Sequence, residues 1–242
     1  HRPYTRYFQR DADTVGISFT DGHPREFGNS LYYVDLRDGA FYRVDGGKIR
    51  DVSDGPLRPS EVEKVFKGSD TQIKPKGYES VPFSAWNCAS AVDAAGNPHI
   101  GYSLYLSNDD HRYRIASWDG TRWVDREIAY AGHCLYTAES SYTGLFAFDP
   151  GDPSRVFIST DVDPYTGKEL GGVHELFTAV IGPTDDIGSI RWSPVTGGSS
   201  WDNIRPMVVA GDGYKVLLWL NGPWSTYVDY EVDVRAIVLE HP

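Results

Sequence analysis

Short β-rich segments recur along this chain in groups of four, separated by turns rich in Gly, Asp, Asn and Pro. The first group comprises residues 4–8, 14–20, 30–36 and 40–44, which read YTRYF, TVGISFT, SLYYVDL and AFYRV. β-Branched and aromatic residues between such turns predict strands, and four sequential strands joined by short turns predict an antiparallel meander. This pattern constrains the fold more than any other feature of the sequence.

The meander recurs three more times. Asp-Gly turns at 38–39 and 119–120 join the third and fourth segments of the first two groups, as a tight hairpin requires. Four such units at a period of about 45 to 65 residues predict an all-β fold of four-stranded antiparallel propeller blades. A β-sandwich, the alternative, would not explain the recurring turns. The predicted blades cover about 1–50, 82–129, 133–196 and 201–240, with an insertion at 51–81 and a short helix at 59–66.

Composition limits the function classes. The 242 residues are 40% hydrophobic, enough for one sizeable domain or part of one. The net charge of −11 argues against a nucleic-acid partner, and no run approaches the roughly 18 apolar residues of a membrane span. The chain opens at His1 without an apolar leader, so we expect a processed chain or a piece of a longer one.

Two further features leave alternatives open. Cys88 and Cys134 match no metal-binding spacing, and they form either one disulfide or two buried thiols. Asp161 and Asp163 have oxygen ligands for calcium but lack the spacing of an EF-hand loop, so a solvated turn is the simpler interpretation. No cofactor is required, although the sequence leaves room for a structural Ca²⁺ or Zn²⁺. The segment GPTDDIGSIRW at 182–192 is typical of a fold-stabilising Asp-box turn.

Blade topology predicts which side chains converge. The entry to the innermost strand and the turn between the second and third strands lie at the same face of a blade, around the mouth of the central channel. The strand entries supply Arg2, Tyr4, Asn87, Tyr142, Asn203 and Arg205. The turns and the path into the third blade supply Asp21, His23, Arg25, Asn108–His111, His133, Tyr136, Asp161 and Asp163. His99 falls at the opposite end of its strand, where we expect a structural role.

Each of these residues also has an ordinary structural interpretation. Arg-Pro pairs at 2–3 and 205–206 precede strands, where an arginine often pairs with an acidic residue of the next blade. A histidine in a polar turn often bonds to its own loop. With 16 tyrosines in the chain, any one of them is more often a core or surface residue than a catalytic one.

Several segments nevertheless resemble the BNR-4 repeat family. They include RPYTRY, FTDGHPREFGNSLYY, HRYRIASWDGTRW, YTGLFAFDPGDPSRVFISTDVDP and DNIRPMVV. The family is similar to sialidase-type propellers and includes seven-bladed lyases acting on ulvan and on rhamnose-glucuronate linkages, with related rhamnosidases. The resemblance spans nearly the whole chain and implies that blades four to seven are present. About three N-terminal blades would then lie in a separate chain or segment.

The resemblance implies a carbohydrate-active protein, secreted or periplasmic, whose partner is an acidic polysaccharide or oligosaccharide. The leading hypothesis is a polysaccharide lyase. Cleavage by β-elimination needs a base, a proton donor and a cation on the uronate carboxylate. The catalytic candidates are His23, His133, Tyr142 and Arg205. The substrate-binding candidates are Arg2, Tyr4, Arg25, Asn87, His111, Tyr136 and Asn203. The alternatives are an exo-glycoside hydrolase, such as a rhamnosidase or sialidase-like enzyme, and a non-catalytic glycan-binding propeller.

Overall fold

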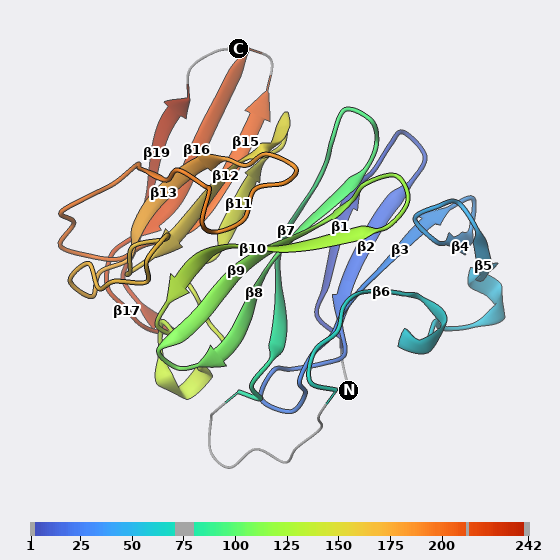
Figure 1. Ribbon diagram of the computed structural model, residues 1–242, viewed down its shortest axis with the longest axis horizontal. Coiled ribbons are helices and arrows are strands. Elements are labelled where there is room, and N and C mark those ends of the chain that lie inside the picture. Colours follow the sequence, from blue (N-terminus) through green and yellow to red (C-terminus); the bar gives the residue numbers. More distant parts are fainter. Residues whose placement is uncertain (1–2, 71–79, 212, 240–242) are drawn as a thin grey trace.

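The computed structural model describes residues 3–70, 80–211 and 213–239, and its strands form four main antiparallel sheets arranged side by side in chain order (Figure 1). The first sheet contains β1 (Thr5–Gln9), β2 (Val15–Thr20), β3 (Leu31–Arg37), β4 (Ala40–Tyr42), β5 (Lys48–Asp51) and β6 (Glu63–Phe66). The second contains β7 (Ser84–Val92), β8 (Pro98–Ser107), β9 (Asp110–Trp118) and β10 (Trp123–Gly132). The third contains β11 (Phe146–Asp149), β12 (Asp152–Thr160), β13 (Glu175–Val180) and β14 (Ser193–Pro194). The fourth contains β15 (Asn203–Gly211), β16 (Tyr214–Asn221) and β19 (Asp233–Leu239).

The remaining elements are short. A separate hairpin consists of β17 (Trp224–Thr226) and β18 (Asp229–Tyr230), and three single-turn 3₁₀ helices are η1 (Val52–Asp54), η2 (Pro59–Glu61) and η3 (Thr137–Glu139). Each of these helices has three residues, too short to cross a membrane, and no longer helix is found within the described ranges.

The meanders predicted from the sequence are confirmed in the first three sheets. Within β1–β5, β7–β10 and β11–β14 each strand pairs with its sequence neighbours, and the first strands β1, β7, β11 and β15 contact one another in series. The β3–β4 turn has positive φ angles at Asp38 (48°) and Gly39 (69°), the backbone that its Asp-Gly sequence favours. These sheets are blades of a β-propeller, with the first strand of each blade innermost.

Two local predictions are wrong. In place of a helix over 59–66, η2 ends at Glu61 and β6 pairs with β3, because Val65 is buried between the first two sheets. In the fourth blade, the sequence TYVDYEV at 226–232 predicts the third strand of the meander, but this segment does not join the sheet. Gly222 and Pro223 end β16, and the chain forms the β17–β18 hairpin before β19 pairs with β16.

The hydrophobic cores lie between neighbouring sheets. One core joins the first and second blades through Leu31, Tyr33, Ile100 and Tyr102. Two others join the second blade to the third and the third to the fourth; their members include Tyr113, Ile128, Phe146, Ile158, Phe157, Leu176, Leu217 and Trp219. Each inner sheet therefore buries both faces against its neighbours.

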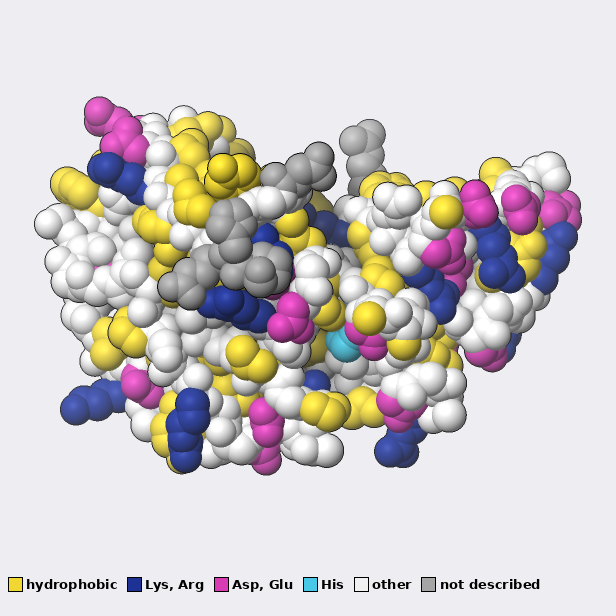
Figure 2. All heavy atoms as spheres, turned by 90° about the horizontal axis from the view of Figure 1, so that it is seen from above, with side chains coloured by type: hydrophobic (Ala, Val, Ile, Leu, Met, Phe, Trp, Pro, Cys, Tyr) yellow, Lys and Arg dark blue, Asp and Glu magenta, His cyan; other side chains and the backbone are white. Residues whose placement is uncertain are grey.

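The outer face of the fourth blade is uncovered. Met207, Val209, Val234 and Val238 are between 46% and 68% exposed, although they occupy strand positions on one side of the sheet. Figure 2 views the molecule from above Figure 1 and shows acidic and basic side chains interspersed on this upper face. The negative net charge is therefore not concentrated in one patch there.

Gly101 of β8 allows the second and third blades to approach closely. A Cβ at this position would lie 1.6 Å from Phe146 Cε1, and the Phe146 ring is itself buried. We expect Gly101→Ala to lower the free energy of unfolding by about 1 to 3 kcal/mol, because the ring must move within a packed core. Urea unfolding measures this. At Gly197 a Cβ meets nothing within 4 Å, so Gly197→Ala is the control, and equal effects of the two substitutions would contradict the packing argument.

Candidate functional site

A cluster of aromatic, cationic and acidic side chains surrounds the entries to the innermost strands. We call it the mouth and define it by Tyr4, His23, Arg25, Trp86, Glu139, Tyr142, Arg205, Trp224 and Tyr227. These residues come from all four blades: the ends of β1, β7, β11 and β15, the β2–β3 turn, η3 and the β17–β18 hairpin. Ring contacts, ion pairs and electrostatic interactions connect them as described below.

His23, Arg25 and Glu139 form a polar group on one side of the mouth. The Arg25 guanidinium lies 3.1 Å from Glu139 Oε1, and His23 Nε2 lies 3.5 Å from Glu139 Oε2. The backbone N–H of Arg25 donates to His23 Nδ1 at 3.1 Å. The proton of a neutral His23 ring is therefore on Nε2, facing the carboxylate.

Burial controls the protonation of this group. Desolvation, aided by the adjacent Arg25, lowers the pKa of His23 to about 4, so its imidazole is neutral at neutral pH. Burial also raises the pKa of Glu139, while Arg25 acts in the opposite direction. Glu139 thus combines an ion pair with a carboxyl group that holds its proton more tightly than usual.

Aromatic rings line the rest of the mouth. Trp86 contacts Tyr4 at 4.5 Å and Tyr142 at 5.8 Å between ring centroids, and Tyr142 stacks nearly parallel to Tyr227 at 6.5 Å. Tyr136 also contacts Tyr227, at 6.3 Å. Such surfaces suit the apolar faces of flat ring compounds.

Arg205 lies on the side of the mouth formed by the fourth blade. Its guanidinium carbon is 4.8 Å from the centre of the Trp224 ring. Its Nε is buried without a hydrogen-bond partner, and no carboxylate of the described residues is within ion-pair distance. Burial and the nearby Arg6 lower its pKa, whereas Tyr142 acts in the opposite direction. Its φ of 56° is unusual for a residue with a side chain, and its N–H donates to the Gly144 carbonyl at 2.7 Å.

The structure therefore brings together five of the predicted residues, Tyr4, His23, Arg25, Tyr142 and Arg205, with Tyr136 beside them. Arg2 lies outside the described residues. His133 pairs with Asp161 at 2.9 Å and Glu169 at 3.4 Å, and although burial opposes them, these carboxylates raise its pKa. No contact joins His133 to the mouth within the described part of the chain.

Three predicted substrate-binding residues have structural roles instead. His111 is fully buried between the carbonyls of Gly132 and Ser140, where it cannot contact a substrate. Asn87 donates to the Ser18 hydroxyl at 2.7 Å and thereby connects the first two blades.

Asn203 is the third of these residues. It is 3% exposed, donates to Glu175 and Ser199, and accepts a hydrogen bond from Trp219 Nε1.

Strand alternation explains why the prediction for Asn87 in the second blade fails: Trp86 faces the mouth, so its neighbour Asn87 faces the adjacent sheet.

The structure also places the residues of the metal and disulfide alternatives. Asp161 is buried and accepts from both the N–H and the ring of His133, while Asp163 caps its own turn at Thr166. No cluster of three or more metal-binding side chains occurs within the described ranges. Cys88 and Cys134 are both free thiols, and Cys88 is buried.

The sequence interpretation missed Glu139, Trp86, Trp224 and Tyr227. Glu139 lies in η3, within the connection between two blades, where no strand pattern marks it. Tyr227 was missed because residues 226–232 were interpreted as a regular strand, and Trp224 because it precedes that segment in a turn. An acidic residue beside tyrosines in YTAESSY was the one available signal.

A protein-family model matches the first half of the chain. Residues 1–131 match the model of the BNR repeat-containing family. A search of curated proteins found no match.

Solved structures share the fold. A PL25 ulvan lyase bound to -[GlcA(1-4)Rha3S]- superposes with a TM-score of 0.57 at 13% identity, covering 98% of this chain and 53% of the lyase. The GH93 α-L-arabinofuranosidase of Fusarium graminearum with arabinobiose gives 0.52 at 13% identity, covering 99% of this chain and 63% of that enzyme. The chain thus spans about half the length of the lyase.

The depressed pKa of His23 makes stability depend on pH. Between about pH 6.5 and 4 the unfolded state binds more protons at this residue than the folded state, so stability falls as pH falls through that range. We expect the loss attributable to His23 to be about 2 kcal/mol between pH 7 and 4.5. Urea unfolding of the wild type and His23→Gln measures it: the variant should lose less stability on acidification. Parallel pH profiles would show that His23 is not buried in a neutral form.

Proposed function

The chain belongs to the BNR repeat-containing family, and we propose that its mouth binds a uronate-containing polysaccharide and cleaves it by β-elimination. The observation that supports this most strongly is Arg205, a partly buried cation without a carboxylate partner among the described residues. An unpaired buried charge is costly, and a substrate carboxylate would supply the missing partner. Arginine suits this role because its planar fork binds a carboxylate through two hydrogen bonds.

Elimination at a uronate places definite demands on the neighbouring groups. A base removes the proton from C5, the C5–H electrons form the C4=C5 double bond, and the C4–O bond breaks. Negative charge develops on the carboxylate in the transition state, where Arg205 stabilises it. The leaving oxygen at C4 then takes a proton. The mouth must therefore provide one proton acceptor and one proton donor beside Arg205.

Tyr142 is the group that we assign to proton transfer. Its hydroxyl lies within electrostatic reach of Arg205, and the Tyr227 ring stacks against it. Burial raises its pKa, with Glu139 and Tyr4 acting in the same direction and Arg205 in the opposite one. As phenolate it takes the proton from C5, and as phenol it returns the proton to the leaving oxygen.

His23, Arg25 and Glu139 are then positioning residues. In the resting structure Nδ1 of His23 accepts the Arg25 N–H and Nε2 faces Glu139, so neither nitrogen presents a free lone pair. Arg25 is already paired with Glu139. We assign this group to holding the substrate opposite Arg205, with Tyr4 and Trp86 stacking on a neighbouring sugar.

A hydrolase is the second candidate, and Glu139 favours it. A buried carboxyl group with a raised pKa is the usual general acid of a glycosidase, which also needs a second carboxylate. Glu26 acts electrostatically on both Tyr4 and His23 and is the candidate for the second carboxylate. The ion pair between Glu139 and Arg25 argues against this role, because it stabilises the charged form of the carboxyl.

The first experiment incubates the chain with ulvan, gum arabic and pectic polymers and follows the ultraviolet absorbance of the conjugated product. We expect Arg205→Ala and Tyr142→Phe each to lower kcat/KM by about 100-fold or more, with little change in the melting temperature. Arg235→Ala, on the exposed edge of the same blade, is the control and should retain activity. Reducing ends without absorbance would identify a hydrolase, and retention without turnover a binding module.

The pH dependence distinguishes the two proton acceptors. If the Tyr142 phenolate is the base, kcat/KM rises about tenfold per pH unit between pH 6 and 9, because the phenolate fraction rises with pH. If His23 is the base, the rate is flat above about pH 5, because its pKa is about 4. We expect the rising profile, and a flat one would transfer the role to His23.

A further inference from the structure

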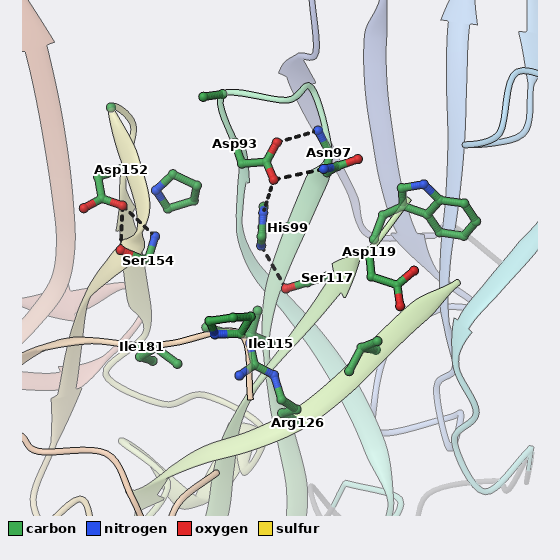
Figure 3. Close-up of a pocket in the computed structure, with 16 residues that line it drawn as sticks. Asp93, Asn97, His99, Ile115, Ser117, Asp119, Arg126, Asp152, Ser154 and Ile181 are labelled. Atoms are coloured by element: carbon green, nitrogen blue, oxygen red, sulfur yellow. Dashed lines mark hydrogen bonds and ion pairs between the residues drawn. The ribbon is translucent and has the colours of Figure 1, made fainter. Parts of the chain in front are cut away.

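A groove lies between the second and third blades, and Figure 3 shows the residues that line it. It has a volume of about 520 Å³, within the range of small-molecule sites. Strand β7 carries Trp86 of the mouth near its start, and Asp93 of the groove follows its last residue, so the two sites lie at opposite ends of this strand. The groove is therefore independent of the proposed mouth chemistry.

Arg126 of β10 provides the cationic group of the groove. One of its terminal nitrogens donates to the carbonyls of Gly182 at 2.6 Å and Asp185 at 2.9 Å, in the Asp-box-like turn of the third blade. No carboxylate of the described residues lies within ion-pair distance of it. The two backbone bonds fix the guanidinium against the groove and leave its other N–H groups available for a ligand.

His99 and Asp93 add an ordered polar wall, which Figure 3 shows along neighbouring strands. His99 Nδ1 is 2.8 Å from the Ser117 hydroxyl, and its Nε2, 3.6 Å from Asp93, has no hydrogen-bond partner. Burial lowers the pKa of His99, with Asp93 acting in the opposite direction and Arg126 in the same one. Asp93 accepts hydrogen bonds from Asn97 and is held in place.

The opposite wall is partly apolar. Ile181 and Pro183 line it together with Asp152, whose carboxylate accepts hydrogen bonds from Ser154. Three aspartates and one arginine line the groove as a whole, so a free anion meets net repulsion. Fixed carboxylate acceptors, guanidinium donors and aliphatic surface together match a molecule with many hydroxyl groups and an apolar ring face.

From this arrangement we propose that the groove between the second and third blades binds a neutral sugar residue. The aspartates accept hydrogen bonds from its hydroxyls, Arg126 donates to its oxygens, and Ile181 and Pro183 pack against its C–H face. This ligand class differs from the acidic sugar proposed for the mouth. A polysaccharide with alternating acidic and neutral residues would then contact the protein at two separate places.

An NMR titration of the ¹⁵N-labelled chain tests the proposal, with L-rhamnose and D-glucuronate as probes. We expect rhamnose to shift the Arg126 Nε–Hε resonance and the amides of Gly151 and Ser154, and glucuronate to shift them at least fivefold less. Ala94→Trp places a large ring at the rim from an exposed position and should abolish the shifts. Ala95→Trp, in the same turn but outside the groove, is the matched control and should keep them.

Arg205→Ala separates this site from the mouth. The groove shifts should persist in that variant, because Arg205 lies at the other end of the blades. Absence of rhamnose shifts in the wild type would overturn the proposal, as would equal shifts in Ala94→Trp or a stronger response to glucuronate. None of these results would affect the lyase assignment, which depends on Arg205 and Tyr142.

Discussion

Each sheet in this chain has two faces, and only another sheet covers them. Tyr33 and Ile100 lie between the first two blades, and Phe146 and Ile158 lie between the next two, so the interior consists of separate layers between sheets. Apolar residues occupy most strand positions between two sheets, and the polar side chains of the mouth come mainly from strand ends and turns. The requirement that sheets cover one another therefore determines where chemistry can occur.

The side chains at these strand ends are only partly exposed to water, and this partial burial shifts their pKa values. At the mouth, burial moves the pKa of His23 down and that of Glu139 up, because desolvation disfavours the charged form of each group. Burial also raises the pKa of Tyr142 and lowers the pKa of Arg205, and the interaction between the two residues opposes both shifts. Four groups with shifted pKa values, three of them in contact with aromatic rings, distinguish this end of the blades from an ordinary solvated rim.

The sequence was sufficient to predict the blades because turn residues and alternating strands are local signals. It was also sufficient for the convergence of Tyr4, His23 and Arg205, which follows from meander geometry. It did not predict which of two adjacent residues faces the mouth, as at Trp86 and Asn87, because both suit a strand. Glu139 lies in a connection without a periodic pattern, and its role depends on Arg25, more than a hundred residues away in the chain. Contacts between blades of this kind are not encoded in any short segment.

The backbone of Arg205 has a consequence for how the position tolerates change. Left-handed φ values cost a residue with a side chain about 1 kcal/mol or more, and glycine or asparagine would relieve that cost. Selection for thermal stability alone would therefore replace this arginine. Retention of this arginine in a functional chain would mean that the function of its guanidinium outweighs the cost of its backbone conformation. Homologues without the activity would not be under that constraint.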